Sequence, residues 1–205
     1  MIILWDFNGT ILDDVEVCIR IENEMLKNHG YAPFDKEKYL EIFQFPVMNY
    51  YASLGVDFNH YSYDEICVDF YKGYDEHFPE CTLTPGFEEK IQELSNKGYH
   101  HVMVSASSQE ALERQCASLG ITKYFDELIG LKDGYAHSKV DRAQEWMRQQ
   151  SKDESYWMIG DSEHDKEVAD TLGVPCVLVA TGHASKRRLK ATGAKVIDTL
   201  FDLEI

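Results

Sequence analysis

The chain of 205 residues is long enough to bury one ample hydrophobic core with a modest inserted subdomain, but not several large domains. Hydrophobic residues make up 44% and charged residues 27% of the chain, which excludes a disordered, fibrous or membrane-embedded protein. The 20 Lys and Arg residues stand against 36 Asp and Glu, and the net charge of −16 would repel a nucleic-acid backbone or an anionic membrane. We therefore expect neither partner, and an anionic substrate would need a local source of positive charge such as a metal ion.

The N-terminal sequence favours a cytoplasmic location. The apolar residues 2–5 meet an acid at Asp6, far too soon for the apolar region of a signal peptide, and no apolar run approaches the ~18 residues that a membrane span needs. The five cysteines are scattered and form no Cys-x-x-Cys pair, so we expect buried or reduced thiols rather than a zinc or redox site. We take a monomer as the default oligomeric state.

The first predicted strand, residues 2–5, is separated from the next by a long stretch of helical patterns. Residues 13–82 show no convincing strand alternation and contain eight of the twelve tyrosines, from Tyr31 to Tyr74. A small helical bundle needs large side chains to fill its core, so we expect most of its aromatic residues to pack inward and a few to face a substrate. We predict a helical cap domain at residues 13–82, with the chain crossing near residues 11–14 and 81–85.

Amphipathic helices follow the insertion. Thr84–Pro85 predicts the start of the first helix, as N-cap and first helical residue, and Ser107 or Ser108 is expected to cap the second. Gly98 and Gly120 stand where these two helices should end.

Short apolar runs alternate with these helices, which is typical of a parallel sheet. We therefore predict an α/β fold, a doubly wound parallel sheet with an inserted helical cap. Residues 1–12 and 83–205 would form the α/β core domain. The predicted strands lie at residues 2–5, 101–104, 156–159, 175–179 and 194–197.

Carboxylates follow two of these strands. Asp6 comes directly after the first strand, and Asp161 and Asp165 follow the strand at 156–159. The carboxyl ends of parallel strands line the ligand crevice, and residues four apart share one face of a helix. Three clustered carboxylates repel one another unless a cation binds between them, and such oxygen ligands suit Mg²⁺. An ionised Asp6 is also a nucleophile that needs no base.

Two further residues could contact an anion. Ser105 follows the strand at 101–104 and is expected to open a helix, where it would contribute to an anion cradle or act as an N-cap. Lys139 begins the next predicted helix and could neutralise a phosphate oxygen, although an isolated Lys is most often a solvated surface residue.

Taken together, in their order and at their strand ends, these motifs resemble the haloacid dehalogenase superfamily of hydrolases. The resemblance is to its phosphoglycolate phosphatase-like branch, which has a Rossmann-like core and a helical, C1-type cap. It spans nearly the whole chain. The motifs that carry it are Asp6–Thr10, Ser105, Lys139 and Gly160–Asp165.

The resemblance implies a Mg²⁺-dependent phosphoric monoester hydrolase that acts on a small phosphorylated metabolite. Asp6 would be the nucleophile and would form an aspartyl-phosphate that water then hydrolyses. The metal would be held by Asp6, the backbone carbonyl of Asn8 and Asp161, with Asp165 in support. The implied substrate-binding residues are Gly9, Thr10, Ser105, Ala106 and Lys139, of which Ser105 and Lys139 would bind the phosphoryl oxygens and count, with Asp6 and Asn8, as catalytic.

The sequence departs from the family at Asn8. Phosphatases of this family have there an Asp that protonates the leaving group, whereas an amide cannot exchange a proton at neutral pH. General acid–base catalysis is typically worth ~10²- to ~10⁴-fold, so ordinary phosphomonoesterase activity should suffer by about that factor. Asn8 is natural in a branch with good leaving groups or substrate-assisted proton transfer, or is an engineered change, or marks a protein that binds without hydrolysis. Deamidation at Asn8–Gly9 to an aspartate is a further hypothesis.

Two other functions stay open beside the phosphatase. A non-catalytic phosphate-ligand binding or regulatory protein is favoured by Asn8 alone. A haloacid dehalogenase-type hydrolase also lacks the second Asp, but it needs no metal, so Asp161 and Asp165 would be superfluous and therefore favour the phosphatase. His164 is expected to face solvent without a catalytic role.

Overall fold

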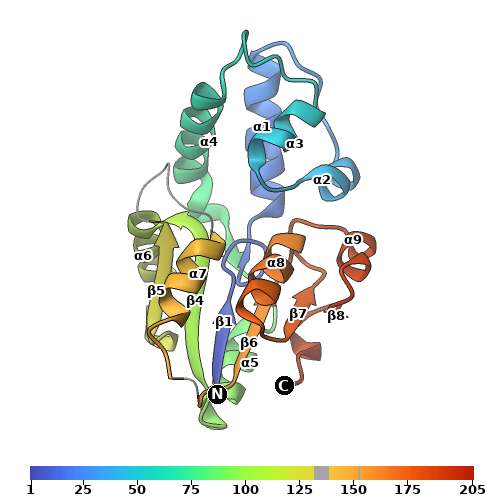
Figure 1. The fold of residues 1–205 in the computed structure, drawn as a ribbon. Coiled ribbons are helices and arrows are strands. Elements are labelled where there is room, and N and C mark those ends of the chain that lie inside the picture. Colours follow the sequence, from blue (N-terminus) through green and yellow to red (C-terminus); the bar gives the residue numbers. More distant parts are fainter. Residues whose placement is uncertain (132–138, 152) are drawn as a thin grey trace.

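The computed structural model describes residues 1–131, 139–151 and 153–205. Within these ranges, six parallel strands form one sheet in the order β5-β4-β1-β6-β7-β8 (Figure 1). Strand β1 therefore lies inside the sheet, and its end carries Asp6 toward the edge where the other parallel strands also end. The predicted α/β fold is confirmed. The strands are β1 (Ile2–Trp5), β4 (His100–Ser108), β5 (Glu127–Leu131), β6 (Tyr156–Gly160), β7 (Cys176–Val179) and β8 (Lys195–Ile197).

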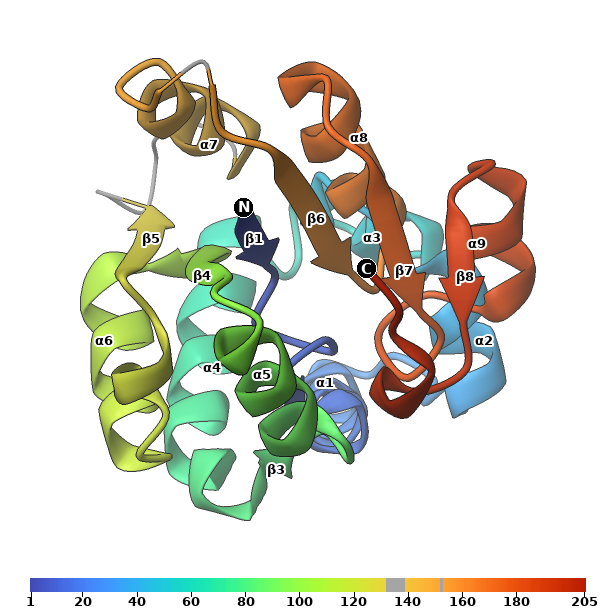
Figure 2. The same ribbon diagram turned by 90° about the horizontal axis from the view of Figure 1, so that it is seen from below.

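Helices cover both faces of the sheet (Figure 2). Ile3 and Trp5 point into the core that holds α5 (Phe87–Asn96) and α6 (Gln109–Ser118). Leu4 points into the opposite core, which holds three further helices. Because successive strand residues point to opposite faces, an apolar run such as residues 2–5 is what a doubly covered strand requires. The helices of the second face are α7 (Lys139–Met147), α8 (Glu163–Leu172) and α9 (Lys186–Ala191). The chain also contains the 3₁₀ turns η2 (Thr122–Tyr124) and η3 (Leu200–Asp202).

The helical insertion, residues 13–82, lies beyond the carboxyl ends of the sheet strands (Figure 1). The chain enters and leaves it through β2 (Leu12–Asp13) and β3 (Thr82–Leu83), which pair antiparallel. Most of its aromatic side chains are buried or packed against the core, as predicted, whereas Tyr71 is exposed. Its helices are α1 (Val15–Asn28), α2 (Lys36–Ile42), α3 (Val47–Ser53), α4 (Tyr63–His77) and the 3₁₀ turn η1 (Phe78–Glu80).

The expectation that Ser105 opens a helix is wrong. Strand β4 continues to Ser108, which accepts a hydrogen bond from the Ala111 backbone N–H (3.3 Å) and caps α6 as predicted. The pairing of β4 with β5 is irregular between residues 104 and 108, so the extra strand residues bulge before the helix starts. Gly130 on β5 allows this, because a Cβ there would collide with the backbone of Gln109.

The prediction that a helix starts at Thr84–Pro85 is also wrong. Helix α5 begins at Phe87 and its N-cap is Gly86, at a φ of 88° that favours glycine. Thr84 instead donates its backbone N–H to Ile11 O (2.8 Å), which extends the β2–β3 ribbon. Gly98 and Gly120 follow α5 and α6 with positive φ, as predicted.

The cysteines carry free thiols, as expected, and all but Cys67 are buried. In the ranges that the structure describes, no helix is both long and apolar enough to cross a membrane.

Shortening a side chain in the middle of the sheet should destabilise the fold strongly. Leu4 is fully buried, so Leu4→Ala is expected to lower the free energy of unfolding by about 2–5 kcal/mol in urea denaturation. Val68 on α4 is 66% exposed, and Val68→Ala should change stability by less than about 0.5 kcal/mol. Equal losses in the two variants would contradict this burial pattern.

Candidate active site

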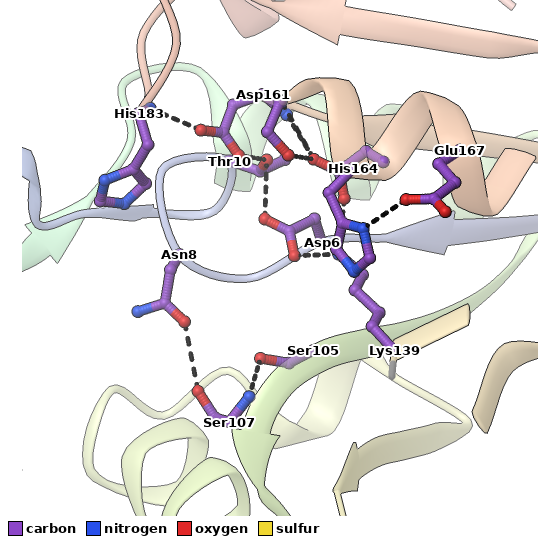
Figure 3. Close-up of polar contacts among 12 residues, drawn as sticks. Asp6, Asn8, Thr10, Ser105, Ser107, Lys139, Asp161, His164, Glu167 and His183 are labelled. Carbon is purple, nitrogen blue, oxygen red and sulfur yellow. Dashed lines mark hydrogen bonds and ion pairs between the residues drawn. The ribbon is translucent and has the colours of Figure 1, made fainter. Parts of the chain in front are cut away.

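A buried ion cluster lies at the end of β1. The Asp6 backbone N–H donates to Ile159 O on β6 (2.9 Å), which fixes the residue directly after the strand. Lys139, the first residue of α7, is 3% exposed and its ammonium contacts Oδ1 of Asp6 and Oδ1 of Asp165, the latter at 2.5 Å (Figure 3). Burial alone would lower the pKa of Lys139, but the two carboxylates outweigh it and hold this pKa above its ordinary value. The lysine is therefore a buried cation and not a solvated surface residue.

Asp165 is oriented by the start of α8. Its Oδ2 accepts hydrogen bonds from the backbone N–H of Asp161 (3.1 Å), from the backbone N–H of Ser162 (3.0 Å) and from the Ser162 hydroxyl (2.7 Å). These contacts leave Oδ1 free to face Lys139. Burial alone would raise the pKa of Asp165, but Lys139 and the Ser162 hydrogen bond keep it below its ordinary value.

Asp161 completes a cluster of three buried acids. An oxygen of Asp6, one of Asp161 and one of Asp165 lie within 4.8 Å of one another. The Thr10 hydroxyl lies 3.2 Å from Asp6 Oδ2 and 3.0 Å from Asp161 Oδ1, and His183 donates its backbone N–H to Asp161 Oδ2 (2.6 Å; Figure 3). The structure thus brings the three predicted acids, Lys139 and Thr10 together.

The acids fit a divalent cation. Burial, and then the charge of Asp165, raise the pKa of Asp6 well above its ordinary value. Burial is also the main cause that raises the pKa of Asp161 to about 6. A bound cation would favour the ionised form of both, and hard carboxylate oxygens are the donors that Mg²⁺ prefers.

A hydrogen-bond network around Asn8 was not predicted. The Asn8 amide donates to Asp14 Oδ2 (2.8 Å) and lies 2.8 Å from the Tyr74 hydroxyl, while its Oδ1 accepts from the Ser107 hydroxyl (3.3 Å). Tyr74 also donates to Asp14 Oδ2 (2.6 Å), and His183 Nε2 lies 3.1 Å from Asp14 Oδ1. Asp14 is thus a buried carboxylate that receives contacts from both the insertion and the sheet.

This network opposes deamidation of Asn8. That reaction requires the Gly9 nitrogen to attack the Asn8 side chain. The Gly9 N–H donates to Leu12 O (2.8 Å) and to Asp14 Oδ1 (3.0 Å), and the Asn8 amide is held by Asp14. Both reacting groups are therefore restrained, despite the flexibility that an Asn-Gly sequence has in isolation.

The buried cluster opens into a cavity of about 460 Å³ between the sheet edge and the insertion. Asp6, Asn8, Ala106 and Lys139 line it. Of the other predicted residues, Gly9, Thr10 and Ser105 do not line it. Ser105 is 1% exposed, and its hydroxyl accepts the Ser107 backbone N–H (3.1 Å), while its neighbours Ala106 and Ser107 line the cavity.

His164 does not face solvent as expected. It lines the cavity, and its Nδ1 lies 3.0 Å from Glu167 Oε2 (Figure 3). Its ring stacks on Phe45 of the insertion with centroids 4.8 Å apart. The expectation failed because sequence periodicity could not place the insertion over α8.

Comparison with known proteins identifies the family. The sequence profile of haloacid dehalogenase-like hydrolases matches residues 3–179. The chain belongs to this family. The phosphoglycolate phosphatase of Rhodobacter capsulatus is 25% identical over 190 residues, covering 88% of this chain and 84% of that one. A proposed pyrophosphatase of Caldanaerobacter subterraneus is 26% identical over 185 residues, covering 86% and 80%.

A solved structure shares the fold of this hydrolase. The haloacid dehalogenase-like hydrolase from Streptococcus pneumoniae superposes with a TM-score of 0.83 at 19% identity, covering 98% of this chain and 95% of that one. The predicted family and the prediction of a hydrolase of this family are confirmed.

The hydrolase carries a further buried acid on the insertion side of its cavity. Glu22 on α1 is 2% exposed, lines the cavity, and accepts a hydrogen bond from the Tyr50 hydroxyl (2.5 Å). Burial raises the pKa of Glu22 to about 7, although the Tyr50 hydrogen bond partly opposes the shift. Periodicity predicts that α1 has a buried face, but it does not distinguish an acid in the wall of a cavity from an acid at the exposed edge of that face.

Glu22 should make stability depend on pH. Because its pKa is about 7 in the folded state against an ordinary 4.5, the folded protein loses stability as pH rises from about 4.5 through 7. Glu22→Gln removes this ionisation. We expect it to match the parent near pH 4.5 and to be more stable at pH 8, by on the order of 3 kcal/mol in urea denaturation.

The control for this test is Glu24→Gln, the same substitution on the exposed side of α1. Its difference from the parent should stay below about 0.5 kcal/mol at both pH values. If the difference in unfolding free energy between Glu22→Gln and the parent is the same at both pH values, burial does not raise the pKa of Glu22.

Proposed function

We propose that this hydrolase is a Mg²⁺-dependent phosphatase that hydrolyses a small phosphorylated substrate through an aspartyl-phosphate. The observation that carries the proposal is the position of Asp6, which lies at the end of β1 beside Lys139, Asp161 and Asp165 and faces a cavity. The phosphatase named among the relatives supports the same chemistry.

Asp6, Asp161, Asp165 and the backbone carbonyl of Asn8 would hold the ion. When bound, Mg²⁺ supplies positive charge that offsets the charge of the phosphoryl group and favours ionised Asp6. Lys139 adds a buried ammonium in contact with Asp6 and Asp165, so an anionic group would enter a cluster that would otherwise repel it.

In the first step an Asp6 carboxylate oxygen attacks phosphorus and the bond to the leaving-group oxygen breaks, and that oxygen takes the electron pair. In the second step water attacks the aspartyl-phosphate, which releases inorganic phosphate and restores Asp6. Lys139 and the amides around Ala106 would bind phosphoryl oxygens. Ser105 would act by orienting this loop, since its hydroxyl accepts the Ser107 N–H.

Asn8 would orient the leaving oxygen or a water but would not transfer a proton. A leaving group that departs as an anion needs less help than one that must be protonated. The proposed enzyme therefore suits good leaving groups.

We also propose that residues 1–12 and 83–205 are the catalytic core and that residues 13–82 act as a cap. The cavity wall formed by Glu22, Tyr51 and Tyr63 supports this, because the insertion would then cover the substrate and exclude bulk water. The β2–β3 ribbon is where the two parts would hinge.

A non-catalytic phosphate-binding protein is the second candidate, favoured by the absence of a proton donor at Asn8. Such a protein would bind phosphate esters without releasing phosphate.

Release of inorganic phosphate from phenyl phosphate, measured with malachite green, tests the proposal. We expect release with Mg²⁺, loss of release with EDTA, and a loss of at least about 10³-fold in Asp6→Asn, which lacks the nucleophile. Asp126→Asn, at a remote exposed acid, is the control and should retain activity. Release that is equal in the parent and Asp6→Asn would exclude this mechanism.

The pairing of Asn8 with Asp14 leads to a second test. Asn8→Asp alone places a second carboxyl group beside the buried Asp14, where an amide now donates at 2.8 Å, so the pair would have to share a proton. The exchanged variant Asn8→Asp/Asp14→Asn keeps one acid and one amide. We expect it to hydrolyse an alkyl phosphate about 10²- to 10⁴-fold faster than the parent, with little gain on para-nitrophenyl phosphate.

Phosphate release at background in the parent, in Asn8→Asp and in the exchanged variant, with every substrate tried, would support the binding protein instead. If the exchanged variant gains the same factor in rate on alkyl and on nitrophenyl esters, the gain does not come from proton donation by residue 8.

A further inference from the structure

The wall of the cavity carries both charged and aromatic side chains. The cations that line the cavity, within the described ranges, are each in contact with an acid. Lys139 contacts Asp6 and Asp165, Arg114 lies 2.6 Å from Asp75, and His183 contacts Asp14. A substrate with a second anionic group would therefore meet cations that are already paired.

Glu22 presents the opposite case. It is a buried acid on the cavity wall, and no Lys or Arg in the described part of the chain contacts it. The Tyr50 hydroxyl donates to it at 2.5 Å, Tyr51 also interacts with it, and the charge of His183 acts on it without an ion-pair contact. A buried carboxylate without a cation in direct contact is costly, and a ligand ammonium group would supply that contact.

The rest of the wall is aromatic. Tyr51, Tyr63, Phe70 and Tyr71 of the insertion line the same cavity as Glu22. Aromatic faces pack against a ring and attract a cation, and a volume of about 460 Å³ accommodates a substituted ring.

The chemistry at Asn8 also favours an aryl leaving group. Without a proton donor the leaving oxygen departs as an anion. A phenol ionises near pH 10, whereas water ionises near 15.7 and alkyl alcohols behave like water. An aryl ester therefore loses its leaving group more readily than an alkyl ester.

We propose that this hydrolase acts on aryl phosphate monoesters whose ring carries a protonated amine, and that Glu22 binds the ammonium group. The proposal rests on the phosphatase function proposed above and names its substrate class. The phosphoryl group would lie at Asp6 and Lys139, the ring between the tyrosines, and the amine at Glu22. Atoms balance as in the general reaction, since the ester and water give inorganic phosphate and the phenol.

Four para-substituted phenyl phosphates of similar size test the proposal. They carry an aminoethyl, a propyl, a hydroxyethyl or a carboxyethyl group, and phosphoglycolate is the fifth substrate. With Mg²⁺ we expect kcat/KM to be roughly tenfold higher for the aminoethyl than for the propyl ester, chiefly through a lower KM. The carboxyethyl ester and phosphoglycolate should be the poorest substrates.

Two variants separate the role of Glu22 from a general effect of charge. In Glu22→Gln the aminoethyl-to-propyl ratio should fall to about one. In Glu24→Gln, on the exposed side of the same helix, the ratio should stay at the parent value. A Glu22→Gln ratio equal to that of the parent would overturn the assignment of Glu22.

The pH dependence of the same ratio gives an independent readout. Since Glu22 has a pKa of about 7, the ratio should rise between about pH 6 and pH 8, and division by the propyl ester cancels ionisation of the phosphate. A flat ratio would contradict binding through an ionised Glu22. The titratable groups that face Glu22 are Cys18 on α1, Tyr39 on α2, Tyr50 and Tyr51 on α3, and His183 after β7.

The outcomes also separate this inference from the function on which it rests. If no ester releases phosphate, the phosphatase itself is excluded. If the propyl ester is hydrolysed through Asp6 but the carboxyethyl ester or phosphoglycolate is hydrolysed faster than the aminoethyl ester, only the substrate class fails. If kcat/KM for the hydroxyethyl ester equals that for the aminoethyl ester, the proposal that the substrate carries an ammonium group also fails.

Discussion

The neutralisation of buried acid is the constraint on which the rest of the site depends. Three carboxylates, those of Asp6, Asp161 and Asp165, lie within 4.8 Å of one another, and one ammonium, that of Lys139, contacts two of them. Three negative charges against one positive leave an excess of two when all are ionised, and one divalent cation balances it. The topology brings these four charged groups together, because β1 lies inside the sheet while α7 and α8 begin at the same edge.

A second network joins the insertion to this edge. Asp14 contacts Tyr74 on α4, Asn8 after β1 and His183 after β7, and Tyr39 on α2 places its hydroxyl 2.8 Å from His183 Nδ1. Burial alone would raise the pKa of Asp14, but the charge and hydrogen bond of His183 keep it lowered. Because these side chains come from both sides of the cavity, the cavity wall and the acid cluster are held by shared contacts, and the insertion is positioned by polar groups as well as by its aromatic core.

Sequence patterns predicted the parts of this molecule that depend on local chemistry. Asp6, Asp161 and Asp165 were predictable because carboxylates directly after apolar strands must lie at one edge of a parallel sheet. Strand β5 was missed, since Glu127–Leu131 includes a glycine and an exposed acid and its pairing with a bulged neighbour is a tertiary effect. Asp14, His183 and Glu22 were missed for a related reason. Glu22 lies on the buried face of α1, whereas Asp14 precedes α1 and His183 follows β7, where no periodicity applies. The groups that Asp14, His183 and Glu22 contact are remote along the chain.

The residue at position 8 shows how such remote contacts change the meaning of a motif. Taken alone, Asn8 is a lost proton donor. Beside Asp14 it is a hydrogen-bond donor to a buried carboxylate, and an Asp in its place would require that one of two adjacent acids stay protonated. In the proposed phosphatase the chemistry at this position depends on the pair, and with Asp14 ionised against His183 the leaving group would depart without a proton. The proposed aryl substrate would meet the same restriction, because the aromatic wall packs against a ring and the phenolate that departs is a more stable anion than an alkoxide.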